Sequence, residues 1–368
     1  MRLRALRQYT QQYRRRAAVL AATLLLGGCA STGGDLGYYW QSVRGHLQLM
    51  NAAHPVPDWL ADTEASPQLK ARLQLAQRIR AFAVSELHLP DNASYHRYAD
   101  LKRRAAVWNV VAAPAYSLVL KTWCFPVTGC VGYRGYYDEQ EARREAQVQR
   151  DSGLEASVYG VPAYSTLGWT NWLGGDPLLN TFIFLPEGEL ARLVFHELAH
   201  QVLYAKNDTM FNESFATAVE RLGGARWLAA QGSPAAREEY ARFDGRRRAF
   251  RALTLQTRRA LERAYALPGG DAAKEKAKQA AMQEFRARYA ELKASWDGFA
   301  GYDAWVANAN NASFGAQAAY DELVPGFEAL FEREGSWPAF YDAARRLAAL
   351  PKEERHRALK ALHNDKET

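Results

Sequence analysis

The sequence contains only three cysteines among its 368 residues, and it has no internal repeat or low-complexity tract. An apolar run at residues 17–26 is too short to cross a bilayer as a finished helix. Apolar residues make up 48% of the chain and charged residues 24%, which excludes disordered, collagen-like and coiled-coil proteins. A chain of this length can bury a large core without disulfides or metals to hold it together.

Acidic residues are absent from the first 28 positions, which hold six arginines: Arg2, Arg4, Arg7, Arg14, Arg15 and Arg16. Taking these six from the 47 basic residues leaves 41 bases against 40 acids, so the formal net charge falls from +7 to about +1. The basic excess is therefore typical of a targeting segment. The sequence carries no nucleic-acid-binding motif, and we expect no nucleic-acid partner.

The apolar run is followed by Leu26-Gly27-Gly28-Cys29, which resembles the bacterial lipobox. This order predicts a signal peptide over residues 1–28, a lipidated Cys29, and a tether over residues 29–37 that is extended from residue 30 onward. Because Ala30 is not the aspartate that retains lipoproteins at the inner membrane of enteric bacteria, we expect a periplasm-facing lipoprotein of the cell envelope, anchored in the outer membrane. The alternative is an ordinary signal peptide with an unrelated cysteine.

Cys124 and Cys130 are the two remaining cysteines, with Pro126 and Gly129 between them. An oxidising compartment beyond the inner membrane favours a disulfide, for which we expect Cα atoms about 4.4–6.8 Å apart. A thiolate metal site is the alternative, but the sequence has no second pair of thiols to complete it.

Hydrophobic periodicity predicts helices at the start of the mature chain, strands in the middle and helices again at the end. We expect strands at 107–111 and 116–120, and an edge strand or loop at 158–169, where proline disfavours a central strand. This order predicts a helix-rich α+β fold. The expected helices lie at 38–86, 138–150, 187–206, 212–230 and 234–366, the last with breaks at 269–270, at 296–301 and near Pro325 and Pro338.

An H-E-x-x-H pentad, from His196 to His200, lies inside the predicted helix 187–206. Residues four apart share a helix face at a separation of about 6 Å, so His196 and His200 can bind one Zn²⁺ ion. Glu197 is offset by one residue, where a general base for a metal-bound water is expected. The alternative is a pair of histidines on a solvent-exposed helix.

Two imidazoles leave zinc one protein ligand short, and Glu213 supplies a carboxylate near the start of the next predicted helix. Here the sequence resembles the gluzincin metallopeptidases. The phrase N-E-S-F-A-x-x-x-E, from Asn212 to Glu220, is similar to the N-E-G-F-A-x-x-x-E motif of zinc aminopeptidases, although the spacer after His200 is shorter. No third histidine follows in the metzincin pattern.

Most of the mature chain resembles a narrower family, the bacterial lipoproteins that are predicted aminopeptidases. The resemblance covers residues 38–43, the block from Cys124 to Cys130, residues 160–169, the pentad with Asn212 and Glu213, and residues 310–325. It implies a zincin-like metallopeptidase. The active-site helix would then lie between a strand-containing N-terminal lobe, 38–210, and a helical C-terminal lobe, 211–368, which carries the third zinc ligand.

The remaining site residues have less specific signals. Related peptidases stabilise the oxyanion with a tyrosine or histidine, which favours Tyr320, with Tyr302 as the alternative. Asn212 is expected either to orient the site or to cap the helix that carries Glu213. Glu220 lies on the same helix face as Glu213, and it is expected to hold an imidazole N–H, to bind a substrate amine or to form a surface salt bridge.

A substrate-binding edge strand is expected beside the zinc site, where its backbone groups would bind an extended peptide. The alternative for this segment is a buried loop. The strand would comprise Ala163, Tyr164, Ser165 and Thr166.

These features favour a zinc-dependent aminopeptidase with a peptide substrate. An endopeptidase or a peptidoglycan hydrolase would share the metal chemistry. A non-catalytic lipoprotein with a retained zinc site is a further alternative, but structural zinc sites usually have four protein ligands and need no general base. An aminopeptidase also needs an acidic anchor for the substrate ammonium group, for which Glu220 and Asp176 are candidates.

Overall fold

The computed structural model describes residues 33–125, 129–163, 174–318 and 322–367. The chain forms two compact units, Met1–Leu47 and Gln48–Thr368. The first described element is helix α2 (Gly33–Asn51), so the last five residues of the predicted extended tether are helical instead. Cys29 and the predicted signal peptide lie outside the described residues.

The helical segment expected at 38–86 consists of three helices rather than one. Helix α2 is followed by α3 (Val56–Ala61) and α4 (Pro67–Ser85). Ser66 caps helix α4 by accepting a hydrogen bond from the Leu69 amide at 3.1 Å. Proline is favourable at the first helical position, because the backbone N–H that it lacks would have no partner within the helix.

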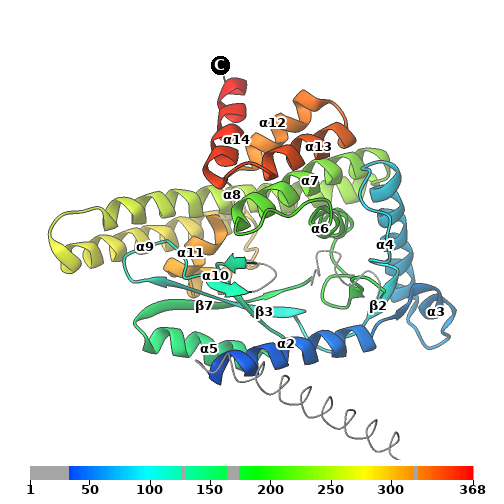
Figure 1. The fold of residues 1–368 in the computed structure, drawn as a ribbon, viewed down its shortest axis with the longest axis horizontal. Coiled ribbons are helices and arrows are strands. Elements are labelled where there is room, and N and C mark those ends of the chain that lie inside the picture. Colours follow the sequence, from blue (N-terminus) through cyan, green and yellow to red (C-terminus); the bar gives the residue numbers. More distant parts are fainter. Residues whose placement is uncertain (1–32, 126–128, 164–173, 319–321, 368) are drawn as a thin grey trace, which may run out of the picture. The chain divides into compact units, whose positions relative to one another are not determined.

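Two three-stranded sheets and one hairpin make up the β structure of the described residues (Figure 1). In the first sheet, β2 (Arg97–Ala99) pairs antiparallel with β1 (His54–Pro55) and parallel with β8 (Leu178–Leu179). In the second, β3 (Val107–Pro114) lies between β6 (Arg134–Tyr136) and β7 (Leu154–Val161), antiparallel to both. Strand β7 is therefore an edge strand, and it ends two residues before Ala163.

The strand expected at 116–120 is absent from the structure, and that prediction was wrong. Strand β3 ends at Pro114, whose carbonyl accepts a hydrogen bond from the Ser117 amide at 3.2 Å. The Lys121 amide then donates to the Ala112 carbonyl at 2.8 Å. The chain thus reverses over a few residues, and this reversal leaves no length for a separate strand.

The predicted disulfide is present in the hairpin formed by β4 (Trp123–Phe125) and β5 (Gly129–Val131). Cys124 and Cys130 are direct partners across this antiparallel pair, with their Cα atoms 3.9 Å apart. The separation is shorter than the predicted range of about 4.4–6.8 Å.

Helices dominate the chain after β7. The expected interruptions are present, and Pro325 and Pro338 stand in the first turns of α12 and α13, where proline is tolerated. These helices are α6 (Glu187–Ala199), α7 (Thr209–Ala230), α8 (Pro234–Tyr265), α9 (Gly270–Ser295), α10 (Asp303–Ala307), α11 (Asn311–Ala318), α12 (Val324–Glu334), α13 (Trp337–Ala348) and α14 (Lys352–Glu367).

The main core of the second unit surrounds α6 and α7. Side chains from α4, α12 and α13 complete this core, and Phe195, Phe215 and Phe327 are fully buried in it. The sheet of β3 is covered by α5 (Glu139–Asp151) on one face and by α11 on the other (Figure 1). A second cluster joins α8 and α9 through Phe250 and Phe285. The fold is therefore α+β and rich in helices.

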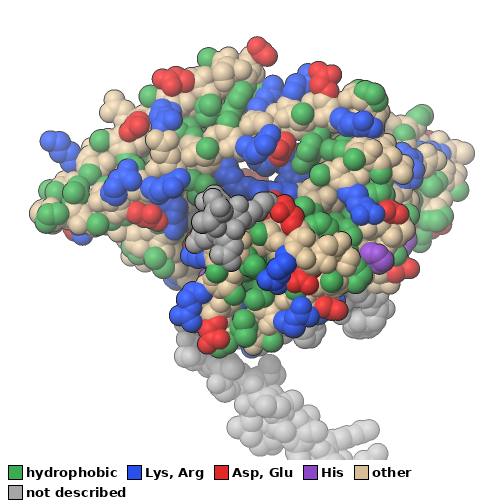
Figure 2. All heavy atoms as spheres, turned by 90° about the horizontal axis from the view of Figure 1, so that it is seen from above, with side chains coloured by type: hydrophobic (Ala, Val, Ile, Leu, Met, Phe, Trp, Pro, Cys, Tyr) green, Lys and Arg blue, Asp and Glu red, His purple; other side chains and the backbone are tan. Residues whose placement is uncertain are grey.

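The surface carries charges of both signs. On the face drawn in Figure 2, basic and acidic side chains are interspersed, with apolar side chains between them. Among the described residues, no helix has both the length and the apolar character needed to cross a membrane.

Candidate metal centre

Helix α6 positions the pentad. Its buried face includes Leu190, Val194 and Leu198, which are fully excluded from solvent. This packing fixes the helix about its axis, so that His196 is presented on a partly buried side. The helix ends at Ala199, seven residues earlier than predicted, but the His200 amide still bonds to the His196 carbonyl at 3.3 Å. The i, i+4 relation of the two histidines is therefore preserved.

Helix α7 positions Glu213. Asp208 caps this helix by accepting a hydrogen bond from the Phe211 amide at 3.2 Å, so the helix begins at Thr209. Asn212 lies inside the first turn and is not the cap. Its side chain instead reaches back to Ala205, donating to the carbonyl at 2.9 Å and accepting from the amide at 2.8 Å. Asn212 thus holds the loop between the helices that carry the predicted ligands.

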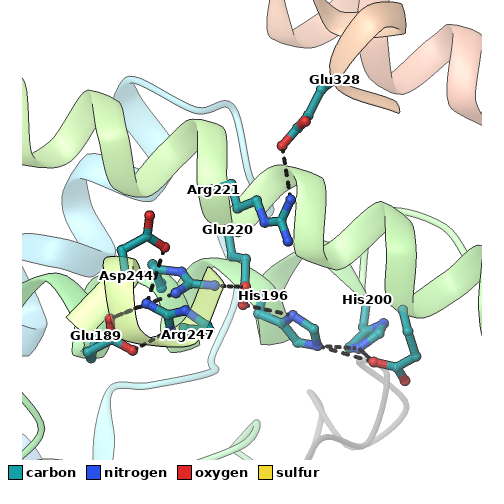
Figure 3. A network of polar contacts seen from close by, with 10 residues as sticks. Glu189, His196, His200, Glu220, Arg221, Asp244, Arg247 and Glu328 are labelled. Carbon is teal, nitrogen blue, oxygen red and sulfur yellow. Dashed lines mark hydrogen bonds and ion pairs between the residues drawn. The ribbon is translucent and has the colours of Figure 1, made fainter. Parts of the chain in front are cut away.

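The structure brings His196, His200 and Glu213 together. The two Nε2 atoms are 3.2 Å apart, and the Glu213 Oε2 atom lies 3.4 Å from His196 Nε2 and 3.7 Å from His200 Nε2 (Figure 3). A triangle with these sides has a centre about 2.0 Å from each corner, which is the length of a bond from zinc to nitrogen or oxygen. The donor atoms are thus spaced to hold one metal ion.

Glu220 orients the first imidazole. Its Oε2 atom lies 3.1 Å from His196 Nδ1, so the carboxylate accepts a hydrogen bond from this ring nitrogen. With the proton held on Nδ1, the lone pair of Nε2 points toward the centre of the triangle. Of the three roles considered for Glu220, the structure supports the one in which it holds an imidazole N–H.

A buried ion-pair network extends from Glu220 away from the metal centre. Arg192, with a side chain 6% exposed, bonds through Nη2 to Glu220 Oε1. The same guanidinium lies 3.8 Å from Glu189, which accepts two hydrogen bonds of 2.8 Å from Arg247 on α8. Figure 3 shows the contacts from His200 through His196 and Glu220 to the Glu189–Arg247 pair. The network thus connects the three helices α6, α7 and α8 to one another.

Electrostatics at the centre follow from this arrangement. Burial lowers the pKa of the His196 imidazole, but its hydrogen bonds to the carboxylates of Glu213 and Glu220 outweigh this effect and raise the pKa well above the ordinary value. Burial raises the pKa of Glu220, yet Arg192 and His196 more than offset it and bring it to about 2. The nearby imidazoles likewise lower the pKa of Glu213 despite burial. The carboxylates of Glu213 and Glu220 are therefore ionised, and that of Glu213 can bind a cation.

Glu197 lies within the same electrostatic environment. Burial raises the pKa of its carboxyl group, as do the charges of Glu213 and Glu220, while His196 and His200 act in the opposite direction. Glu197 is not part of the metal-binding triad of donor atoms, in line with its offset on the helix. This placement is compatible with a proton-accepting role beside the metal.

The other predicted site residues are placed differently. Tyr302 stacks on Phe250 with ring centroids 4.0 Å apart, and its charged neighbours are Arg247 and Glu189 rather than the triad. Ala163 is buried at 8% exposure. Tyr320, Tyr164, Ser165 and Thr166 lie outside the described residues, so their roles stay predictions.

Sequence reasoning missed Arg192 and two tyrosines. Arg192 stands four residues before His196 on a helix with a largely apolar buried face, and an arginine at such a position is a signal for a buried partner. The charge of Glu213 raises the pKa of Tyr159 on β7 and that of Tyr204, after burial as the larger cause. The charge of Glu213 therefore acts on both phenols, whereas the charges that act on Tyr302 belong to residues outside the triad.

Comparison with known proteins finds a family match. No curated protein matches the chain. No solved structure matches it either. Residues 37–359 match the family described as "Putative aminopeptidase", and this match includes the pentad, Glu213 and Glu220. Because the match extends from α2 into α14 and so covers most of the sequence, the chain belongs to this family.

Proposed function

We propose that the protein is a zinc-dependent aminopeptidase of the bacterial cell envelope, held there by a lipid on Cys29. The observation that carries the catalytic part is the triad of His196, His200 and Glu213, whose donor atoms share a centre about 2.0 Å away. The family supports peptide hydrolysis as the reaction. The lipobox-like sequence before Cys29 supports the location.

The donor set fits zinc. Two imidazole nitrogens and one carboxylate oxygen are typical ligands of catalytic zinc sites, which keep a fourth position for water or substrate. A bound zinc ion supplies Lewis-acid chemistry, activating water as a nucleophile and polarising the carbonyl of the scissile bond. Among the described residues, this triad is the one group of histidine, cysteine and acidic side chains that could hold a metal ion.

The protein side chains then divide the remaining work. Glu197 accepts the proton of the attacking water and returns it to the leaving amine, as a carboxylate beside the metal can. Glu220 holds the proton on His196 Nδ1 and so keeps Nε2 available as a ligand. Arg192 keeps Glu220 ionised and in place.

The anchor for the substrate ammonium group is a separate question. Glu220 already accepts hydrogen bonds from His196 and Arg192, so its two oxygens are occupied. Asp176 is only 1% exposed. Neither Glu220 nor Asp176 therefore presents a free carboxylate to a substrate ammonium group. Cleavage assays decide whether the protein prefers peptides with a free N-terminus.

Peptide libraries test the proposal directly. The soluble fragment from residue 30 onward would be incubated with peptides whose N-termini are free and with the same peptides acetylated, each with and without a zinc chelator. We expect stepwise removal of N-terminal residues from the free peptides alone and no cleavage with chelator. Internal cleavage of both libraries would indicate an endopeptidase, and chelator-resistant cleavage would contradict the zinc chemistry.

The envelope location needs its own test. Mass spectrometry of the N-terminal peptide from a bacterial host should find Cys29 acylated. A Cys29→Ser chain that is processed and still sediments with membranes, with no lipid attached, would contradict the proposed anchor.

A further inference from the structure

Helix α2 carries an exposed apolar arc. Tyr39, Trp40, Val43 and Leu47 are 42%, 70%, 54% and 51% exposed. With 100° of rotation per residue, these four positions fall within about 100° of the helix circumference. Large apolar side chains this exposed are few among the described residues, and four of them share one helix face. The arc lies wholly within the first unit, Met1–Leu47.

The chemistry of the arc is that of a lipid–water interface. Trp40 and Tyr39 have apolar rings with a polar tip, the combination that is enriched where hydrocarbon meets the headgroups. Val43 and Leu47 add aliphatic area for the acyl boundary. Arg44 is exposed on the same helix, one residue beyond Val43, where a guanidinium can reach lipid phosphates.

The sequence places this arc close to a lipid anchor. Helix α2 begins at Gly33, four residues after Cys29 in the lipobox-like motif. Four extended residues span at most about 14 Å. A lipid on Cys29 would thus hold the start of α2 within about 14 Å of its attachment point at the bilayer.

We propose that the arc of Tyr39, Trp40, Val43 and Leu47 docks on a phospholipid bilayer, so that α2 lies in the plane of the membrane interface. The inference rests on the proposed envelope location and is independent of the peptidase chemistry. A second copy of the chain is a poorer occupant, since a stable dimer interface uses about 20–30 residues on each side. The arc adds a second membrane contact to the acyl chains and sets the orientation of the helix.

Vesicle binding tests the proposal without the lipid anchor. The soluble fragment from residue 30 onward keeps every residue that the structure describes, and it would be titrated with vesicles of phosphatidylethanolamine and phosphatidylglycerol at a ratio of about 3:1. The variant Trp40→Gln/Val43→Gln/Leu47→Gln removes the arc and keeps good helix-forming residues. The matched control, Val119→Gln/Val148→Gln/Leu267→Gln, changes three exposed apolar residues elsewhere.

The expected result is loss of vesicle affinity by at least about tenfold in the α2 variant and less than about twofold in the control, with unchanged circular dichroism in both. Equal affinity of all three chains, or no binding by the unaltered chain, would overturn the proposal. A concentration-dependent dimer that the α2 variant abolishes would also overturn it, because the arc would then face a second copy.

Hydrogen exchange of the full-length chain gives a second measurement that does not depend on any variant. In lipid nanodiscs of the same composition, amides of residues 38–47 should exchange more slowly than in the soluble fragment from residue 30 onward measured without lipid. Unchanged exchange in this segment would contradict the docking. Slowed exchange without acylation of Cys29 would support the arc while refuting the anchor, so the two claims are distinguishable.

Discussion

The Arg192 side chain shows how much of the site lies outside the motif. It is 6% exposed, and its partner Glu220 is 14% exposed. A buried charge without a partner is costly, so each of these two groups depends on the other. Because Glu220 also accepts a hydrogen bond from His196 Nδ1, the ion pair helps to orient a proposed metal ligand from outside the triad.

Replacing Arg192 therefore tests the network. The change Arg192→Leu should lower the free energy of unfolding by about 3–5 kcal/mol, because it leaves Glu220 buried without its cation. It should also weaken zinc binding by about 10–100-fold, the usual cost of disturbing the partner of a ligand. Urea denaturation and competition with a fluorescent chelator measure the two effects.

The exposed pair of Arg226 and Glu86 provides a control. Their side chains are 51% and 43% exposed and lie 2.7 Å apart. Arg226→Leu should change the free energy of unfolding by at most about 1 kcal/mol and leave zinc affinity unaltered. Equal losses for Arg192→Leu and Arg226→Leu would mean that the buried network has no special role.

At the scale of elements, the α6–α7 connection sets the separation of the ligands. His200 is the C-cap residue of α6, and Glu213 lies in the first turns of α7. The loop between the two helices therefore sets the distance between these two side chains. Asn212 closes this loop onto Ala205. The disulfide hairpin supports the loop as well, since the Cys130 amide donates to Asn207 Oδ1 at 2.8 Å.

Removing the Asn212 side chain should loosen this connection. Asn212→Ala leaves the amide of buried Ala205 without a partner, while its carbonyl keeps only the bond from the Asp208 amide at 3.3 Å. We therefore expect a loss of about 1–3 kcal/mol in the free energy of unfolding, together with weaker zinc binding. Thermal and urea unfolding check the first effect. The control is Asn308→Ala, where an exposed amide bonds to Ala304 within a helix end. A stability loss no larger than that of the control would show that the loop does not need Asn212.

The proximity of His196 and His200 could be predicted from the sequence because its geometry is local. Two residues four apart on a helix meet whatever the rest of the fold does, so His196 and His200 follow from the pentad. Glu213 needed a motif, since its approach depends on the loop and on the packing of α7. The network through Arg192 and Arg247 could not be predicted, because it joins side chains 55 residues apart in different helices.

The errors at this scale have physical causes as well. Apolar alternation at 116–120 suggested a strand, but the turn after Pro114 and the bond from Lys121 to Ala112 reverse the chain. Asn212 was considered as a helix cap, but Asp208 takes that position, four residues earlier. Both cases turn on hydrogen bonds between residues whose contacts depend on the exact path of the backbone, and periodicity does not reveal them.

At the scale of the whole second unit, metal binding and folding should be linked. The ligands come from α6 and α7, which also form the centre of the main core. An ion that binds only the folded chain stabilises it by a free energy that grows with the logarithm of its concentration over its dissociation constant. Removing zinc with a chelator should therefore lower the unfolding temperature, and restoring zinc should recover it.

The pH dependence of this link has a definite sign. Zinc needs a neutral His196, whereas hydrogen bonds from the metal-free imidazole to the carboxylates of Glu213 and Glu220 raise its pKa well above 6.5. Binding must then release a proton, so zinc affinity should fall about tenfold for each unit of pH below that raised pKa. Without metal, the charged imidazole stabilises the fold below about pH 6.5, and this contribution is lost as pH rises through the raised pKa.

Competition titrations at pH 6, 7 and 8 check the first statement, and urea unfolding of the chelated protein over the same range checks the second. The zinc-loaded and metal-free chains should show opposite trends. Zinc affinity that does not change across this range would contradict the protonated state of His196 in the metal-free protein.

The most direct test of the zinc peptidase account compares metal content and turnover in one variant. Glu197→Gln removes the proposed proton acceptor and leaves the triad of His196, His200 and Glu213 unchanged. Elemental analysis should find about one zinc ion per chain in both proteins, while hydrolysis of an N-terminal residue should fall by at least about 10²-fold in the variant. A Glu197→Gln chain that has lost its zinc, or that keeps both zinc and full turnover, would contradict the account.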